Sequence, residues 1–352
     1  MLTSEYSVQT AGLVDLQVNG FAGVDFNDPN LHPEAFEKCL ERMLSTGVTS
    51  CLPTLISGSE EHLKACFQAL EKAREASDFG RDMVRGYHLE GPFISSKPGF
   101  RGCHLPEATH PADPDFFARL QEAAGGNIGM ITVAPEIEGV MALIETLSGQ
   151  GIIVALGHTT AGLEQIRGAA DAGAVLSTHL GNGTAPLLSK HDNPILAQLS
   201  EDRLSASFIA DGYHLSREQL QIYLRAKSSS RTLLVTDATS ATAAPPGRYS
   251  LGQLELERGR EPVAYAHGTG RPAGSAVTLD QCVRNVIDWF DISLEEAVSW
   301  ASQNPKRILG GESTETEDPD HVVKWIKKEG QWMVREARNG SFVVNNTNPE
   351  DS

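Results

Sequence analysis

The sequence is poor in cysteine and has no long apolar run. Its five cysteines are an odd number and none is spaced as CxxC, which argues against a disulfide framework or a zinc knuckle. No stretch approaches the roughly 20 uninterrupted apolar residues that a membrane-spanning helix needs. The N-terminal segment MLTSEYSVQT is neither basic nor apolar enough for a secretory signal. We therefore expect a cytoplasmic protein with reduced thiols.

Basic residues are few relative to acidic ones. The chain has 29 lysines and arginines against 46 aspartates and glutamates, and its formal net charge is −17. Nucleic acids and anionic membranes need a basic surface, so neither is expected as a partner. A small anionic substrate stays possible, because a pocket can be locally positive on an acidic protein. Its site must then be built from a few specific donors.

What the chain does contain is an alternation of short β-branched runs and amphipathic segments. The expected strands cover residues 13–18, 48–55, 83–89, 128–133, 152–156, 174–178, 204–209 and 232–235. The expected helices cover residues 33–45, 60–76, 113–124, 139–148, 163–172 and 217–227. This alternation predicts an α/β protein with a (β/α)8 TIM barrel. An open doubly wound sheet is the alternative, which the missing GxGxxG motif after the first strand weakens.

The last third of the chain departs from this alternation. Residues 250–257 alternate like a short strand, and residues 268–274 read as a Gly/Arg/Pro loop. Ser275 is a plausible N-cap for a helix over residues 276–289. A second helix is expected over residues 294–302.

The termini are expected to form a small unit of their own. The acidic linker ESTETEDPD follows the compact region, and residues 322–344 read as two or three strands around polar turns. We therefore predict a catalytic barrel over residues 12–311. A small β appendage is expected from residues 1–11 together with 312–352.

Four apolar strands end in side chains that could bind a metal or move a proton. They are Glu90 in YHLEGPF, His158 in ALGHTT, His179 in STHLGNG and Asp237 in LVTDATS. Active sites of parallel α/β barrels lie at the carboxyl ends of strands, so these groups could meet above the core. Two imidazoles and one carboxylate are typical of catalytic zinc, and Asp237 could act opposite them as a general base. For each residue taken alone, a structural hydrogen bond, cap or turn is the alternative.

Longer stretches surround these residues in a fixed order from about residue 15 to residue 310. They read VDLQVNGFAGVDFND, HLEGPFIS, KPGFRGCHLPE, TVAPE, GHTTA, THLGNGTAP, IADGYHL, LVTDATSA, GSAVTLDQCVRNVIDW and NPKRILG. Together they resemble the N-acetylglucosamine-6-phosphate deacetylases of the amidohydrolase superfamily. The resemblance implies a barrel of the metal-dependent amidohydrolase type. The family's β-sandwich would be much reduced here, because few residues precede the first barrel strand.

The resemblance also implies roles for the strand-end residues. Glu90, His158 and His179 would hold one divalent metal ion per subunit. Zinc is the first expectation, and iron(II), cobalt(II) and manganese(II) also suit this ligand set. Asp237 would act first as general base and then as general acid.

The first strand argues against a second metal ion. Many amidohydrolases begin this strand with His-x-His, whereas this chain has Gln17 and Asn19 at these positions. Neither residue supplies an imidazole. We therefore expect a mononuclear site in which the two amides support the ligands by hydrogen bonds.

Further residues match positions that contact the substrate in the family. His104, in RGCHLPE, matches a histidine close to the scissile amide and could polarise its carbonyl; a histidine of a surface loop is the alternative. His214, in ADGYH, matches a phosphate-contacting histidine. Asn182 and Gly183 match a loop that approaches the sugar phosphate, where glycine would let main-chain N–H groups come close to an oxyanion.

One loop departs from the family pattern. The family places an arginine there that reaches the phosphate in the neighbouring subunit's site, whereas this chain reads GNGTAPLLSKHDNP, with Lys190 and His191 near that position. A lysine lacks the bidentate fork that fits phosphate. We expect a homodimer in which residues 189–193 lie near the neighbouring site, and an altered phosphate contact. A solvated loop lysine is the alternative for Lys190.

These expectations define a reaction and its competitors. The resemblance implies deacetylation of N-acetylglucosamine 6-phosphate to glucosamine 6-phosphate and acetate in amino-sugar catabolism. One alternative is a deacylase for a related N-acyl amino sugar that lacks the 6-phosphate. The other is a non-catalytic barrel that binds sugar phosphates.

Overall fold

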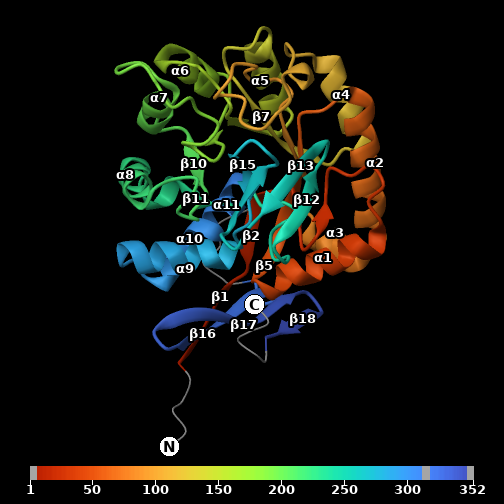
Figure 1. The fold of residues 1–352 in the computed structure, drawn as a ribbon, viewed down its shortest axis with the longest axis vertical. Helices are drawn as coiled ribbons and strands as arrows, with labels where there is room; N and C mark the ends of the chain where they lie inside the picture. The colour runs from red at the N-terminus through yellow and green to blue at the C-terminus, as the bar shows by residue number, and fades with distance from the viewer. Residues whose placement is uncertain (1–5, 311–317, 347–352) are drawn as a thin grey trace, which may run out of the picture.

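The computed structural model describes residues 6–310 and 318–346. Eight parallel strands form one sheet in consecutive order around a barrel (Figure 1). They are β2 (Leu13–Val18), β5 (Val48–Ile56), β6 (Tyr87–Glu90), β7 (Ile128–Val133), β8 (Ile153–Leu156), β9 (Leu176–Ser177), β10 (Ser205–Phe208) and β11 (Thr232–Leu234). The predicted barrel is confirmed.

The first and last strands meet just beyond β11. The backbone N–H of Asp237 donates to the carbonyl oxygen of Gln17 over 2.9 Å, and Val18 pairs with Ala238 in a parallel bridge. These contacts close the barrel and place the first and eighth strand ends side by side.

Helices cover the outside of the barrel, as Figure 1 shows. They are α1 (Pro33–Ser45), α2 (Glu60–Glu75), α3 (Asp78–Met83), α4 (Pro114–Ala123), α5 (Val140–Gly149), α6 (Leu163–Asp171), α7 (Pro194–Ser200), α8 (Arg217–Lys227), α9 (Leu279–Phe290), α10 (Leu294–Ala301) and α11 (Gln303–Ile308). Side-chain caps define several of the helix starts. Ser216, for example, accepts from the N–H of Gln219, whose side chain accepts in return from the N–H of Ser216.

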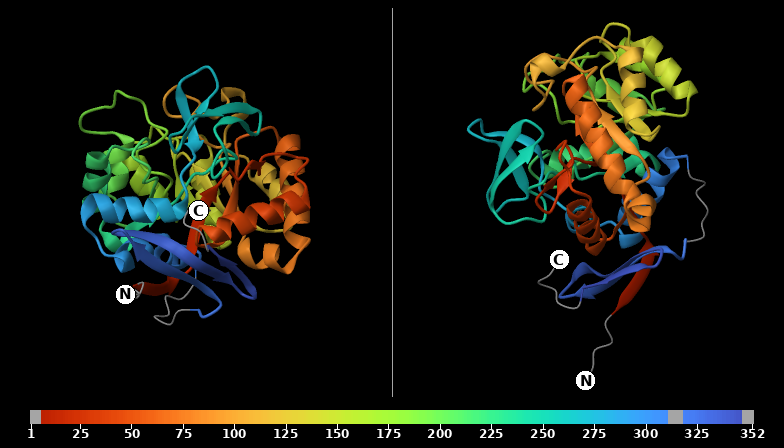
Figure 2. Two further views of the ribbon diagram at one scale, coloured as in Figure 1. Left: turned by 60° about the horizontal axis from the view of Figure 1, so that its bottom comes forward. Right: turned by 90° about the vertical axis from the view of Figure 1, so that its right-hand side faces the viewer.

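Two small antiparallel sheets are connected to the barrel, one before the N-terminal end of β2 and the other after the carboxyl end of β11. The terminal sheet has the order β1 (Ser7–Ala11), β16 (His321–Lys328), β17 (Gln331–Asn339) and β18 (Phe342–Asn345). The lid sheet, as we call it, follows β11 and consists of β12 (Gly247–Leu251), β13 (Leu254–Arg258), β14 (Val263–Ala266) and β15 (Arg271–Ser275). A two-residue pair, β3 (Gly20–Phe21) with β4 (Val24–Asp25), completes the sheets. Figure 2 shows the lid sheet in teal and the terminal sheet in blue as separate projections.

The terminal sheet combines both ends of the described chain. Its buried Trp325 donates an indole N–H to Thr10, and Asn339 donates to the carbonyl oxygen of Thr49 in the barrel. The three strands found after residue 320 agree with the expected two or three. The boundary expected at residues 311 and 312 lies outside the described residues, so the exact division of the chain stays a prediction.

One expected strand begins too early. Residues 83–89 were expected to be extended, but Met83 ends helix α3 and β6 starts only at Tyr87. The helix forms because Ser77 caps it by accepting from the N–H of Gly80, and because Phe79 and Met83 bury one face at i, i+4 spacing. Helix α7, which Asn193 caps through two backbone N–H groups, was not expected at all.

The lid sheet corrects two further expectations. Residues 250–257 form parts of two strands rather than one, because the chain turns at Gly252, where φ is +56°. The expected loop at residues 268–274 contains most of β15. Ser275 ends that strand instead of capping a helix: its hydroxyl donates to the carbonyl oxygen of Thr236, and α9 starts after Thr278.

No helix in the described part of the chain is long and apolar enough to cross a membrane. All five cysteines are free.

Candidate active site

The four strand-end residues converge at the carboxyl ends of the barrel strands. Glu90 is the last residue of β6, while His158, His179 and Asp237 follow β8, β9 and β11 within three residues. All four are buried. The last three have positive φ angles of 50°, 28° and 50°, a conformation that costs a non-glycine residue about 1–3 kcal/mol. The sharp turns direct these side chains inward over the barrel.

Glu90 is the centre of the cluster. Its Oε1 accepts from Nε2 of His179 at 2.9 Å and lies 3.2 Å from Nε2 of His158. Burial by itself would raise the pKa of Glu90, but these two histidines hold it well below its usual range. Burial likewise opposes charge on His179, and the hydrogen bond to Glu90 overcomes it, raising the pKa of His179 to about 9. With no metal ion bound, Glu90 and His179 therefore carry opposite charges.

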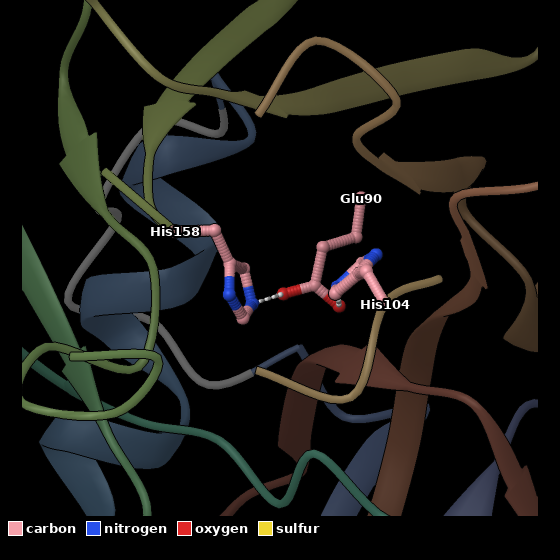
Figure 3. A group of neighbouring side chains, drawn as sticks. All are labelled: Glu90, His104 and His158. Carbon is pink, nitrogen blue, oxygen red and sulfur yellow. Dashed lines mark hydrogen bonds and ion pairs between the residues drawn. The ribbon is translucent and has the colours of Figure 1, made fainter. Parts of the chain in front are cut away.

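His104 approaches the other oxygen of Glu90. Its Nε2 lies 4.0 Å from Oε2, and Figure 3 shows His104 and His158 both directed at the carboxylate. Nδ1 of His104 accepts from the backbone N–H of Ser57. Burial lowers the pKa of His104 to about 3. Its ring is therefore neutral with the proton on Nε2, so it presents a donor to the site.

His158 has the opposite tautomer. Its Nδ1 lies 2.9 Å from the carbonyl oxygen of Phe100. A carbonyl oxygen can only accept, so Nδ1 donates and the neutral ring keeps a lone pair on Nε2. Nε2 of His158 is thus suited to bind a cation, whereas Nε2 of His104 is not.

The cluster fits a divalent metal ion. Ligand atoms of Glu90, His104 and His158 lie within 4.8 Å of one another, and His179 reaches the same carboxylate. Buried Nδ1 of His179 has no hydrogen-bond partner in the described chain, so Glu90 is the partner that holds this ring through its nitrogens. A carboxylate with two or three imidazoles is a donor set typical of catalytic zinc and related ions.

Asp237 lies opposite Glu90, and the side-chain amides of Gln17, in β2, and of Asn19, just after β2, contact these carboxylates. Oδ1 of Asp237 accepts from Nδ2 of Asn19 at 2.7 Å and from Nε2 of Gln17 at 3.3 Å. The same Gln17 nitrogen donates to Oε1 of Glu90 at 2.9 Å. Burial, with the charge of Glu90, raises the pKa of Asp237 to about 6. One carboxylate oxygen is thus held in place, and Oδ2 has no hydrogen-bond partner among the described residues.

A cavity of about 620 Å³ opens over this cluster. Glu90, His104, His158, His179 and Asp237 line its inner end. The remaining walls include Asn182, Gly183, Tyr213 and His214 together with Leu251, Arg271, Pro272 and Gly274 of the lid sheet or its turns. Its volume suits a small polar molecule such as a sugar phosphate.

Three of the expected substrate residues line this cavity. His214 is held through Nδ1 by Asp211 at 2.6 Å, which leaves Nε2 free to face a ligand. Asn182 donates its side-chain amide to the carbonyl oxygen of His179. Gly183 has φ +57°, and a Cβ there would lie 2.5 Å from Nδ1 of His158, so only glycine fits.

Lys190 and His191 lie elsewhere. Both are exposed and neither lines the cavity of this chain. Their loop is tethered at Asp192, which accepts from the backbone N–H of Leu163. Tyr213 and Arg271 also line the cavity, although the sequence did not predict them as site residues. The only signal for Arg271 was the Gly/Arg/Pro composition before Ser275.

Comparison with known proteins identifies the family. No family model matches the sequence. Human N-acetylglucosamine-6-phosphate deacetylase is 36% identical over 352 residues, covering 93% of this chain and 84% of the relative. The N-acetylgalactosamine-6-phosphate deacetylase of Escherichia coli O157:H7 is 31% identical, covering 84% and 77%. The chain belongs to the N-acetylglucosamine-6-phosphate deacetylase family.

A solved structure of the same family has the same fold. It is an aspartate-to-alanine mutant of the Mycobacterium smegmatis N-acetyl-D-glucosamine-6-phosphate deacetylase in complex with N-acetyl-D-glucosamine-6-phosphate. The TM-score is 0.86 at 27% identity, over 97% of this chain and 87% of that one. The resemblance drawn from the motifs is confirmed, and with it the amidohydrolase type of barrel. The protein is a hydrolase of the N-acetylglucosamine-6-phosphate deacetylase type.

Proposed function

We propose that this protein hydrolyses the acetamido group of N-acetylglucosamine 6-phosphate, releasing acetate and glucosamine 6-phosphate in amino-sugar catabolism. The family relationship supports the substrate class. The observation that carries the chemistry is the position of Asp237, with one oxygen held by two amides and the other free toward the cavity that contains Glu90.

Glu90, His158 and His179 are the residues proposed to hold one divalent ion. The tautomers separate His158, whose Nε2 keeps a lone pair, from His104, whose Nε2 carries a proton. At His179 the incoming ion would replace the proton that Nε2 shares with Glu90. Zinc suits the set best, while iron(II), cobalt(II) and manganese(II) are also compatible. Bound there, the ion would supply Lewis-acid polarisation and lower the pKa of a water molecule.

Asp237 is proposed to move the proton in both halves of the reaction. Its free Oδ2 accepts a proton from the attacking water as the new C–O bond forms. The same carboxyl then gives that proton to the amide nitrogen as the C–N bond breaks, so that a neutral amine and acetic acid form; the acetic acid loses its proton to solvent and leaves as acetate. Gln17 and Asn19 hold Oδ1 and keep the carboxylate facing the substrate.

His104 is proposed to stabilise the developing oxyanion. Its Nε2–H points into the inner end of the cavity, where the substrate's acetyl carbonyl would lie. Ser57 fixes the ring through Nδ1, so the donor is oriented before the substrate arrives. A donor held in this way stabilises the transition state without reorganisation.

Asn182, Gly183 and His214 are proposed to bind the sugar and its phosphate. They line the cavity together with the lid sheet, and they lie in the loops that follow β9 and β10, the two strands beside β11 in the barrel. Gly183 exposes its main chain to the cavity, and Nε2 of His214 is unoccupied by Asp211. A phosphate oxyanion could therefore accept hydrogen bonds from the main chain at Gly183 and from Nε2 of His214.

A homodimer is proposed as the working form. Leu187 and Ile222 are 89% and 59% exposed, and Leu196 and Tyr213 are 48% exposed each, on or next to helices α7 and α8. Helices α7 and α8 contact each other, so the exposed apolar side chains Leu196 and Ile222 on them favour a protein partner. The loop with Lys190 and His191 adjoins this region, so it would lie near the neighbouring subunit. Sedimentation of the purified protein tests this, and a monomer at micromolar concentration would contradict it.

The free cysteines support a cytoplasmic location.

The central experiment measures acetate release by the metal-reconstituted protein on four substrates. These are the N-acetyl derivatives of glucosamine and galactosamine, each with and without the 6-phosphate. We expect the highest kcat/KM on N-acetylglucosamine 6-phosphate. A preference for the galacto epimer, as the name of one relative suggests, or for unphosphorylated sugars would redirect the assignment. No release from any of the four would leave the non-catalytic alternative.

A further inference from the structure

Cationic side chains are scarce around the cavity. Among the described residues that line it, Arg271 is the only lysine or arginine. Two buried carboxylates, Glu90 and Asp237, lie at the inner end, and the whole chain carries a formal charge of −17. An anionic ligand therefore meets an unfavourable field unless a cation faces it directly.

Arg271 stands at the outer end of the lid sheet. It begins β15, the strand whose last residue, Ser275, donates its backbone N–H to the carbonyl oxygen of Asp237. Gly274 is close enough to this strand end that a Cβ would lie 2.9 Å from the Asp237 carbonyl oxygen. A strand rises about 3.3 Å per residue, so three residues carry Arg271 up to about 10 Å from that point. Arg271 and Asp237 therefore lie at the two ends of the cavity wall that β15 forms.

The guanidinium group of Arg271 is also available to bind a ligand. Within the described residues it makes no ion pair and no side-chain hydrogen bond, whereas Arg248 on the same sheet pairs with Glu255 at 2.9 Å. Arg271 is exposed and therefore sits at the rim, where it remains hydrated until a ligand arrives. An arginine presents a planar fork that matches the oxygens of a phosphate group.

We propose that Arg271 binds the phosphate of the substrate from the same chain and sets the preference for a phosphorylated amino sugar. This inference rests on the proposed deacetylase function. The substrate would lie along the lid wall with its acetamido group at Asp237 and its 6-phosphate at the rim. Arg271 would face the anion from the lid sheet, while His214 faces it from the barrel loops. The cation of the anion site would thus come from the lid sheet rather than from Lys190.

The test compares Arg271→Met with the parent enzyme. Methionine keeps an unbranched side chain but has no charge and no fork. We expect KM for N-acetylglucosamine 6-phosphate to rise about tenfold or more, as for the loss of a charged hydrogen bond, with a much smaller change in kcat. The ratio of kcat/KM between phosphorylated and unphosphorylated substrate should fall by a similar factor. Arg271→Lys should lie between the two proteins.

Arg248→Met is the matched control. It removes the same kind of side chain from the lid sheet at a position outside the cavity, and it should leave the substrate ratio within about twofold of the parent, as for most surface pairs. An Arg271→Met enzyme with the parent's KM and substrate ratio overturns the role of Arg271 while the deacetylase function stands. A parent that releases no acetate from the phosphorylated sugar overturns both.

Discussion

Gln17 donates its side-chain amide to Oε1 of Glu90 over 2.9 Å. The same nitrogen lies 3.3 Å from Oδ1 of Asp237, so one amide links the carboxylate proposed to hold a metal to the one proposed to move a proton. An amide N–H is a donor and cannot bind a cation through its nitrogen. The position therefore supplies no imidazole for a second metal ion, and its N–H group orients the two acids.

One divalent ion per chain is the expected metal content. Gln17→Ala should leave this stoichiometry unchanged and lower kcat about tenfold, because removing a group that orients ligands or a base commonly costs 10–100-fold in affinity or activity. Elemental analysis and acetate release measure the two effects. Gln253→Ala, in the exposed turn of the lid sheet, is the control. Two tightly bound ions per chain would contradict the proposed site.

Asp237→Asn should keep the metal and lose turnover. The amide cannot accept a proton from water, and general acid–base groups contribute about 10²–10⁴-fold to rate. Asp202→Asn, at a surface aspartate paired with Arg231, controls for the loss of a negative charge. An Asp237→Asn enzyme with normal kcat ends the assignment of the base.

His104 and His179 should differ when each is replaced by asparagine. His179→Asn removes a proposed ligand and should cost the protein its metal. His104→Asn removes only an oriented donor, so the metal should stay while kcat falls about 10²–10³-fold, as for loss of one oxyanion donor. Metal analysis of both variants after dialysis makes the comparison. Loss of metal from the His104 variant alone would favour the ligand set Glu90, His104 and His158.

Activity should fall on the acidic side. Asp237 works as a base only when it is ionised, and burial together with Glu90 raises its pKa to about 6. A cation bound beside Glu90 favours ionisation of its neighbour, so the acid limb of kcat/KM should lie at or below pH 6. Below that point the rate should drop tenfold per pH unit. A limb that starts well above pH 7 would assign the titration to another group.

Gly183→Ala should damage the metal site. A Cβ would lie 2.5 Å from Nδ1 of His158, and φ is +57°, so the new methyl group must displace the ring. We expect metal affinity and activity to fall at least tenfold, while the fold survives. Gly149→Ala, at the end of α5 with nothing within 4 Å of the added Cβ, should leave both unchanged. Metal titration and thermal melting distinguish the two variants.

Local sequence patterns predicted the structure correctly wherever they repeat along the chain. The eight strands and most of the helices follow from the alternation of β-branched and amphipathic segments, since burial on both faces leaves a direct mark on composition. Glu90, His158, His179 and Asp237 were identifiable because each follows an apolar strand, and barrel topology brings such ends together.

The errors have two origins: a short helix whose cap and buried side chains outweigh an apolar run, and contacts between residues far apart in the sequence. The expected strand at residue 83 proved helical because a cap at Ser77 and two buried side chains outweighed the apolar run. Ser275 looked like a cap because hydroxyl residues often are, but its hydroxyl donates to the carbonyl oxygen of Thr236, which follows β11 and lies 39 positions earlier. Nothing within a short window records such a partner.

The sequence by itself determined the barrel, the residues at its strand ends and the family, because each depends on residue type and order along the chain. Only the tertiary structure decided which nitrogen of His104 and of His158 carries the proton, since Ser57 and Phe100 set it across 47 and 58 positions. It also decided that Arg271, rather than Lys190, lines the cavity. Those facts depend on distances between remote residues, which the fold alone creates.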